Sequence, residues 1–424
     1  MSNPDKTIIA LFTHGGGMRG LIPAHIMTKI EERTGMRMAD MVDIFAGPST
    51  GSILNAALTR ANPDKPDQPL YRARHLVRFY EREGIKIFPP DDYRNFRGIL
   101  HDFNNRTLKL SQLNRLFRHG HYDPNNLAIA LNALYGDAKL GESLSSLIIP
   151  TYNIDSEQLE VAEEKDETGD TPARTVNNFM DQGGHAVWLK NIKQQGPAGA
   201  KGCTPEVSLY DAVMASCAAP TYYPCYHFNA TFPQNLRKGK ITPYQKELSC
   251  IDGVIFDNPC ISYLGAIRRH VPEDHKLIMI VLGTGYINRS VKKEDWNRYG
   301  SLGVVDPVND LPLINIFFHA SESALMESFE EEMGDNLYVF NAVLPNDSDD
   351  INIPSTEIDD ASPENLKKLN HFAHNIIVEQ SDKLDKLCDL LTSHRDAKQS
   401  GKPIRISGAR RFYSLLGKKN KIRK

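Results

Sequence analysis

Ser49 lies in the run Gly47-Pro48-Ser49-Thr50-Gly51, which matches the pattern G-x-S-x-G. An apolar run from Val42 to Ala46 precedes it, and a helix-like run from Ile53 to Leu58 follows. The flanking glycines let a chain turn sharply from strand to helix, which exposes the serine hydroxyl. The N–H groups of the new helix point toward the same place. The pattern indicates a nucleophilic serine, and the alternative is an idle serine in a glycine-rich turn.

A second glycine-rich turn, Gly15-Gly16-Gly17, follows the apolar run from Thr7 to Phe12. Three consecutive glycines leave N–H groups uncovered and let a ligand approach closely, so the turn can cradle a phosphate or an oxyanion. It lacks the Lys-Ser/Thr ending of a P-loop and the spacing of G-x-G-x-x-G, which argues against a nucleotide fingerprint. Arg19 is an accessory candidate at this turn, and equally a first-turn surface residue.

A nucleophilic serine needs a base, either a histidine in a triad or a carboxylate in a dyad. The histidines downstream lie in no distinctive motif: His270, His275, His319, His371 and His374. Asp252-Gly253 follows a strand-like run that ends at Ile251. On its own this Asp-Gly pair indicates a turn. The residues alone therefore leave the identity of the base open.

Four blocks in order resemble the patatin-like phospholipases, which are serine acyl hydrolases. Gly15–Gly20 resembles the family's oxyanion loop, and Gly47–Gly51 its nucleophile elbow. Ala215–Thr221 is similar to its Ala/Ser-rich helix that ends in Ala-Pro, and Ile251–Gly253 with Asn258-Pro259 to its catalytic Asp-Gly block. Leu282–Gly285 matches a strand end common in the family. The blocks span roughly residues 7–285, with weaker similarity to about residue 390.

The resemblance implies a Ser–Asp dyad without histidine. Ser49 is then the nucleophile, Asp252 the general base, and the backbone amides of Gly15, Gly16 and Gly17 the oxyanion hole. The chain departs from the family pattern in four places: His14, Pro48, Ser52 and Val254. His14 stands where the family often has Asp. None of these changes removes a catalytic group, so they bear on substrate preference and rate.

The elements that must position these residues indicate an α/β fold. Strand, turn and helix occur twice in the first 60 residues, which is typical of a sheet with parallel strands. With the resemblance we expect a three-layer α/β/α patatin-like fold with a mostly parallel central sheet. We expect a hydrolase domain over residues 1–390, with a polar elaborated loop at about 160–206, and a basic C-terminal tail over 391–424.

Composition and length fit a globular protein. The 424 residues are 40% hydrophobic and 24% charged, which argues against a mainly disordered, collagen-like or disulfide-scaffold chain. No apolar run approaches the about 18 residues of a spanning helix, and the N-terminal apolar run is too short for a secretory signal. The six cysteines form no C-x-x-C pair. We expect reduced, mostly buried thiols and a cytoplasmic compartment, with neither cofactor nor metal.

Charge is unevenly distributed along the chain. The net charge is −3, but residues 398–424 hold 10 Lys/Arg and no acidic residue, whereas residues 299–366 hold 15 acidic residues and no Lys/Arg. Residues 1–397 therefore carry 40 basic against 53 acidic residues, a net charge of −13. A basic tail with interleaved aromatic and leucine residues suits an anionic membrane face. Docking on the acidic segment and a frayed, solvated end are the alternatives.

An apolar stripe with arginine neighbours offers a second route to lipid. Phe96, Ile99, Leu100 and Phe103 fall on one helical face. This stripe suits a lid or interfacial helix, and the alternative is a helix packed on the core.

The sequence thus predicts a lipid acyl hydrolase, either phospholipase A or lysophospholipase, that contacts membranes peripherally. The rival functions are a general carboxylesterase and a non-catalytic lipid- or nucleotide-binding regulator on the same fold. We expect no nucleic-acid partner. An uncontrolled phospholipase would damage its own cell, so we expect an activator, such as a host factor or a small nucleotide, which no residue identifies. If the protein is a bacterial effector, we expect it to be delivered to a host cell.

Overall fold

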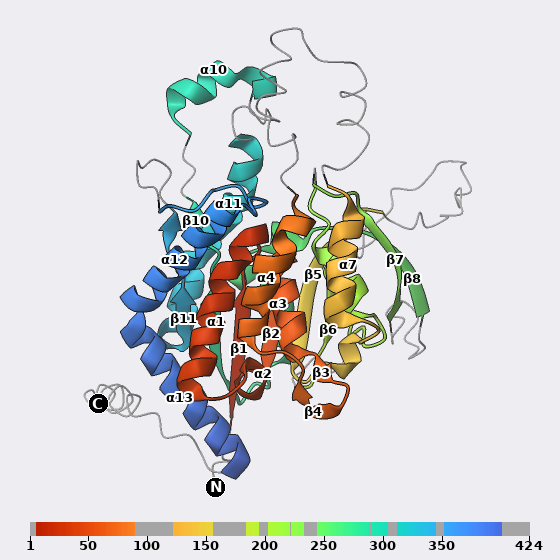
Figure 1. Ribbon diagram of the computed structural model, residues 1–424, viewed down its shortest axis with the longest axis vertical. Helices are drawn as coiled ribbons and strands as arrows, with labels where there is room; N and C mark the ends of the chain where they lie inside the picture. Colours follow the sequence, from red (N-terminus) through yellow and green to blue (C-terminus); the bar gives the residue numbers. More distant parts are fainter. Residues whose placement is uncertain are drawn as a thin grey trace, which may run out of the picture.

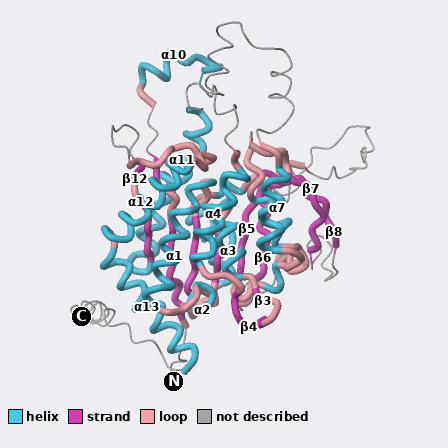
Figure 2. Tube along the Cα trace, viewed as in Figure 1, coloured by secondary structure: helices cyan, strands magenta, loops and turns pink. Residues whose placement is uncertain are grey.

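A mostly parallel sheet forms the centre of the computed structural model, which describes residues 6–89, 122–155, 184–194, 202–220, 222–232, 244–287, 291–303, 312–344 and 352–400. Over these ranges the sheet has eight strands in the order β11-β9-β1-β2-β5-β8-β7, with β6 also paired to β5. In Figure 2 the strands of this sheet are drawn in magenta at the centre of the molecule. Their bounds are β1 (Thr7–Thr13), β2 (Ile44–Ala46), β5 (Ser146–Asn153), β6 (His185–Asn191), β7 (Tyr226–Phe232), β8 (Tyr244–Ile251), β9 (Lys276–Leu282) and β11 (Leu337–Phe340).

Five neighbouring strands, β11, β9, β1, β2 and β5, run parallel. The strands β6 and β8 run antiparallel to β5, and β7 runs antiparallel to β8. Two small sheets pair β3 (Ala61–Asn62) with β4 (Lys65–Pro69) and β10 (Tyr286–Ile287) with β12 (Val343–Leu344). The parallel strands bring their carboxyl ends to one edge, where ligand sites of open α/β sheets form.

Helices cover both faces of the sheet (Figure 1). One face carries α1 (Leu21–Thr34), α3 (Ser49–Thr59), α4 (Ala73–Ile87), α7 (Pro124–Tyr135), α8 (Leu209–Ser216), α12 (Pro363–Glu379) and α13 (Ser381–Ser400). The other face carries α9 (Pro259–Ser262) and α11 (Pro312–Met333). Two further helices are α2 (Met38–Met41) and α10 (Lys293–Gly303). The expected three-layer α/β/α fold is confirmed.

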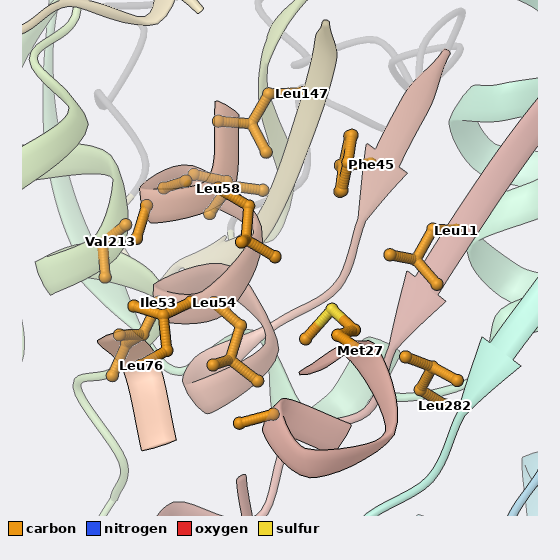
Figure 3. Close-up of a cluster of buried hydrophobic side chains, with 14 of the residues drawn as sticks. Leu11, Met27, Phe45, Ile53, Leu54, Leu58, Leu76, Leu147, Val213 and Leu282 are labelled. Atoms are coloured by element: carbon orange, nitrogen blue, oxygen red, sulfur yellow. The ribbon is translucent and has the colours of Figure 1, made fainter. Parts of the chain in front are cut away.

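The central strand β1 divides its side chains between two cores. Ile9 and Leu11 pack with the helices of the α1 face, as Figure 3 shows for Leu11. Ile8, Ala10 and Phe12 pack on the opposite side with residues of α9 and α11. Because strand side chains alternate between faces, a strand covered on both sides is apolar throughout. This explains the continuous apolar run in the sequence.

The predicted polar loop at about 160–206 is wrong where residues are described, because β6 lies inside it and pairs with β5. On one face of β6 the side chains of Val187 and Leu189 are buried. Two alternate apolar residues are too few to distinguish a strand in a polar segment.

The predicted stripe from Phe96 to Phe103 and the tail beyond residue 400 lie outside the described residues. Over the described part of the chain, no helix combines the length and apolarity needed to cross a membrane.

The last described helix, α13, runs past residue 390, the predicted end of the hydrolase domain. Its side chains Leu391 and His394 are buried. Nε2 of His394 lies 3.1 Å from Oδ2 of Asp43, an oxygen that also accepts the Ile9 N–H at 2.8 Å. The described polar contacts therefore fasten this helix to the start of the central sheet.

Replacing this histidine should loosen α13. We expect His394→Ala to lower the free energy of unfolding by about 2 kcal/mol, because it removes a buried ring and one of the hydrogen bonds to Asp43. Urea unfolding followed by circular dichroism measures the change. The exposed neighbour Ser393 provides the control, with Ser393→Ala expected to stay within about 0.5 kcal/mol of the wild type. Equal losses in both variants would contradict the anchoring role.

Candidate active site

Ser49 occupies a sharp turn between β2 and α3. The strand ends at Ala46, the helix begins at Ser49, and the φ angle of Ser49 is 50°. Among the described non-glycine residues no other has a positive φ. Such a conformation is sparsely populated and persists only where the surroundings impose it. Ser49 is half-buried while its neighbour Thr50 is buried, so the turn leaves the serine as the accessible hydroxyl.

The flanking glycines allow β1 to approach this turn. A Cβ atom on Gly47 or on Gly51 would lie 2.1 Å from the carbonyl oxygen of Thr13. The side chain of Asn55 joins β2 to β1. Its amide donates to the Ala46 carbonyl of β2 at 2.9 Å, and its oxygen accepts from the Thr13 hydroxyl of β1 at 2.9 Å. The two glycines of the G-x-S-x-G pattern are therefore sterically required.

Asp252 lies at the end of β8 and is hydrogen-bonded to Ser49. Its side chain is buried, and Oδ1 accepts the Val254 N–H at 2.8 Å. Burial raises the pKa of the Asp252 carboxyl from 3.8 to about 7. The hydrogen bonds from Ser49 and Val254 oppose this rise in pKa, and the negative charge of Asp257 adds to it. The carboxyl therefore titrates near neutral pH beside the serine hydroxyl.

Ser216 supports the turn from the end of α8. Its hydroxyl accepts the Ser49 N–H at 3.0 Å and donates to the Pro150 carbonyl at 2.7 Å. The elbow is thereby tied to α8 and β5. Ser216 falls within the predicted Ala/Ser-rich block, but the sequence gives it no role, because a small polar residue in a helix carries no spacing signal.

The glycine-rich turn crosses directly beside Ser49. A Cβ atom on Gly15 would lie 3.2 Å from Cβ of Ser49, so glycine permits the close approach. The Gly15 carbonyl accepts the Thr284 hydroxyl at 2.6 Å, and its N–H donates to Oδ1 of Asp257 at 3.0 Å. Gly16 and Gly17 have φ angles of 146° and 55° and are partly exposed. In the described part of the chain, no group accepts their N–H groups.

Arg19 follows this turn in the short helix η1 (Gly17–Gly20), and only 8% of its surface is exposed. Its Nε lies 3.5 Å from the position of a Cβ on Gly16. The structure thus places the Arg19 side chain against the glycine-rich turn and not on the outer surface of the first helical turn.

Three of the candidate histidines bond to other groups. His270 is buried and contacts Nζ of Lys190 at 2.9 Å. His275 contacts Asp274 at 2.8 Å, and His371 contacts Asn375 at 3.2 Å. Asp252, in contrast, is a titratable group whose side chain interacts with the Ser49 hydroxyl. Within the described residues no group of three His, Cys, Asp or Glu side chains is arranged to hold a metal ion.

One pair at the site has no predicted role. Nδ1 of His14 lies 3.2 Å from Oδ1 of Asp257, the same oxygen that accepts the Gly15 N–H. The two residues are 243 positions apart, so spacing gives no sign of their contact. One feature of the sequence could have predicted this contact. His14 stands where the family often has Asp, so a carboxylate from another part of the chain could be expected beside it.

Comparison with known proteins identifies the class. A family model described as patatin-like phospholipase matches residues 11–264, more than half of the chain, and the chain belongs to this family. The match includes the serine elbow, the glycine-rich turn and the Asp-Gly block. Membership supports lipid acyl hydrolysis in general terms.

Similar proteins are found among plants. The chain is 26% identical over 335 residues to patatin-like protein 2 of Arabidopsis thaliana, covering 74% of this chain and 69% of that protein. It is 24% identical over 418 residues to patatin-like protein 2 of Oryza sativa subsp. indica, covering 93% and 89%. Among solved structures, human GIVD cytosolic phospholipase A2 aligns with a TM-score of 0.41 and 10% identity over 92% of this chain. The chain spans about three-fifths (61%) of the length of that enzyme.

The raised pKa of Asp252 predicts a pH-dependent stability. A folded-state pKa near 7 against 3.8 for the free carboxyl means that the folded protein holds this proton more tightly, so stability falls as pH rises from about 4 through 7. We expect Asp252→Asn to raise the free energy of unfolding by on the order of 2 kcal/mol at pH 8 and to change it little at pH 4. Urea unfolding at both pH values tests this. A variant equally stabilised, or destabilised, at both values would contradict the shifted pKa.

Proposed function

We propose that the chain hydrolyses fatty-acyl esters of phospholipids or lysophospholipids, as a phospholipase A or lysophospholipase, through a Ser49–Asp252 dyad. The observation that carries the proposal is the buried Asp252 carboxyl hydrogen-bonded to a serine held at positive φ. A base whose pKa lies near 7 is well matched to proton transfer at neutral pH. Family membership supports the lipid ester as substrate class.

In the first half-reaction, Oγ of Ser49 attacks the ester carbonyl carbon while its proton passes to Asp252. Negative charge develops on the carbonyl oxygen, where backbone N–H groups of the glycine-rich turn stabilise it. The C–O bond to the glycerol breaks, and Asp252 returns the proton to the departing alkoxide. The fatty acyl group remains as an ester on Ser49.

In the second half-reaction, water attacks this ester and gives one proton to Asp252. The bond to Ser49 then breaks, the serine recovers its proton, and the fatty acid leaves. Of the three predicted oxyanion donors, Gly15 already donates its N–H to Asp257. The proposal therefore assigns the oxyanion to the N–H groups of Gly16 and Gly17.

The dyad predicts the kinetic effect of three substitutions. Ser49→Ala and Asp252→Asn should each lower fatty-acid release from dispersed phospholipid at least about 1000-fold, because each removes a group that acts in bond making. His371→Ala, an exposed control on α12, should retain wild-type turnover. Product analysis by mass spectrometry measures all three proteins.

Two results would contradict this assignment. Near-wild-type release by a folded Asp252→Asn variant would exclude the dyad, and loss of release in a folded His371→Ala variant would favour a triad. Parallel assays with a short-chain soluble ester separate the substrate classes. Turnover confined to the soluble ester would establish a general carboxylesterase, and no turnover of any ester would favour a binding protein on this fold.

We further propose that the basic C-terminal tail attaches the enzyme to anionic membranes. The argument is its charge, because residues 398–424 carry 10 Lys/Arg and no acidic residue on a chain that is otherwise acidic. Each cation near an anionic surface contributes about 1 kcal/mol of attraction. Ten cations can therefore hold the chain at an anionic membrane although its net charge of −3 has the same sign as the membrane.

Shortening the chain tests this attachment. Ending it after Ser400, where α13 ends, should lower binding to phosphatidylglycerol-containing vesicles at least about tenfold while sparing turnover of a soluble ester. Vesicle sedimentation at low and high salt measures binding. A Lys292→Gln/Lys293→Gln variant, which removes exposed charge elsewhere, should bind as the wild type does. Unchanged binding by the shortened chain would exclude the tail as the membrane contact.

A further inference from the structure

Asp257 stands between the two loops that the proposed chemistry must hold together. It ends the short helix η5 (Gly253–Phe256), which begins directly after Asp252. Its Oδ1 accepts the Gly15 N–H at 3.0 Å and lies 3.2 Å from Nδ1 of His14. The side chains of His14 and Asp257 are only 12% and 19% exposed. The loop of the base is therefore tied to the loop of the oxyanion donors through one carboxylate.

We infer that Asp257 is a positioning residue, whose carboxylate fixes the Gly15 peptide and thereby aims the Gly16 and Gly17 N–H groups at the carbonyl oxygen of an ester bound at Ser49. The inference rests on the proposed function, because it assigns Asp257 a part in that reaction. Asp257 acts through the glycine loop and not on the substrate.

The backbone of the loop explains why an external tether is needed. Glycine has few conformational preferences, so consecutive glycines do not fix the direction of their own N–H groups. The Gly15 peptide is held at both ends, its N–H by Asp257 and its carbonyl by Thr284 at 2.6 Å. Gly16 and Gly17 follow immediately at positive φ. A shift of Gly15 would therefore redirect the donors that follow it.

The tether carries a charge that the site must balance. A carboxylate close to the position of a developing oxyanion repels it, and the same charge raises the pKa of Asp252. The charged and titratable groups around this tether are His14 at the end of β1, Asp252 on its own loop, and Arg19 beside Gly16. The imidazole of His14, which is a titratable group, contacts the same Asp257 oxygen that accepts the Gly15 N–H.

Two substitutions at Asp257 separate positioning from other roles. Asp257→Asn retains an oxygen that can accept the Gly15 N–H, whereas Asp257→Ala removes it. We expect Asp257→Ala to lower kcat on a soluble ester on the order of 100-fold with KM within about twofold, because misplaced donors weaken the transition state more than the ground state. Asp257→Asn should recover most of this loss. Asp335→Ala, an exposed surface control, should match the wild type.

The pH profile supplies a signature that a merely structural role would not give. Removing the negative charge in Asp257→Asn should move the acidic limb of kcat/KM to lower pH, because the like charge that raises the pKa of Asp252 is gone. Full or increased activity of Asp257→Ala would overturn the inference and would mean that the carboxylate is idle or blocks the hole. Equal losses in the Ala and Asn variants would overturn it as well.

Hydrogen exchange tests the tether without reference to turnover. In Asp257→Ala the amides of residues 13–20 should exchange at least about tenfold faster than in the wild type. Asp257→Asn and Asp335→Ala should exchange these amides at the wild-type rate. Unchanged exchange in Asp257→Ala overturns the tether whatever the kinetics. If Asp257→Ala exchanges faster but the wild type hydrolyses no ester, the proposed function is excluded, and with it the catalytic part of the inference. The structural role of Asp257 as a tether would still stand.

Discussion

The close approach of the β1 carboxyl end to the elbow at Ser49 is the constraint on which the rest of the site depends. The Thr13 carbonyl occupies the space that side chains at positions 47 and 51 would need. This contact forces the chain from β2 into α3 within three residues and leaves Ser49 at a φ of 50°. The strain is local, and the cores on both faces of β1 hold it in place.

Besides the backbone strain at Ser49, the site carries an energetic penalty for burying the Asp252 carboxylate. Asp252 ends a strand inside the protein, so its charged form loses most of its hydration, and burial is the largest cause of its raised pKa. The same burial gives the carboxyl a pKa suited to accepting a proton near neutral pH. A residue that reduces the stability of the folded chain above pH 7 is thus the one that we propose as the base for Ser49.

The sequence reveals the parts of the site that are local along the chain. The strand, turn and helix around Ser49 are predictable because glycine spacing and apolar periodicity lie within about 20 residues, and four ordered blocks then identify Asp252. Contacts across the sheet leave no such trace. The His14–Asp257 pair and the support of Ser49 by Ser216 join residues more than 160 positions apart. β6 is missed because two inward side chains are too few to establish alternation.

The family match ends at residue 264, yet the glycine-rich turn depends on residues beyond it. The His14 N–H donates to the Leu282 carbonyl at 3.0 Å, and Thr284 holds Gly15. The Ile358 carbonyl accepts the Met18 N–H at 2.7 Å and fills the space that a side chain on Gly17 would need. Since β9 also pairs with β1 along its whole length, the last third of the described chain completes the site. The acidic segment around Ile358 is therefore in direct contact with the loop beside Ser49, and any partner that moves it would act on that loop.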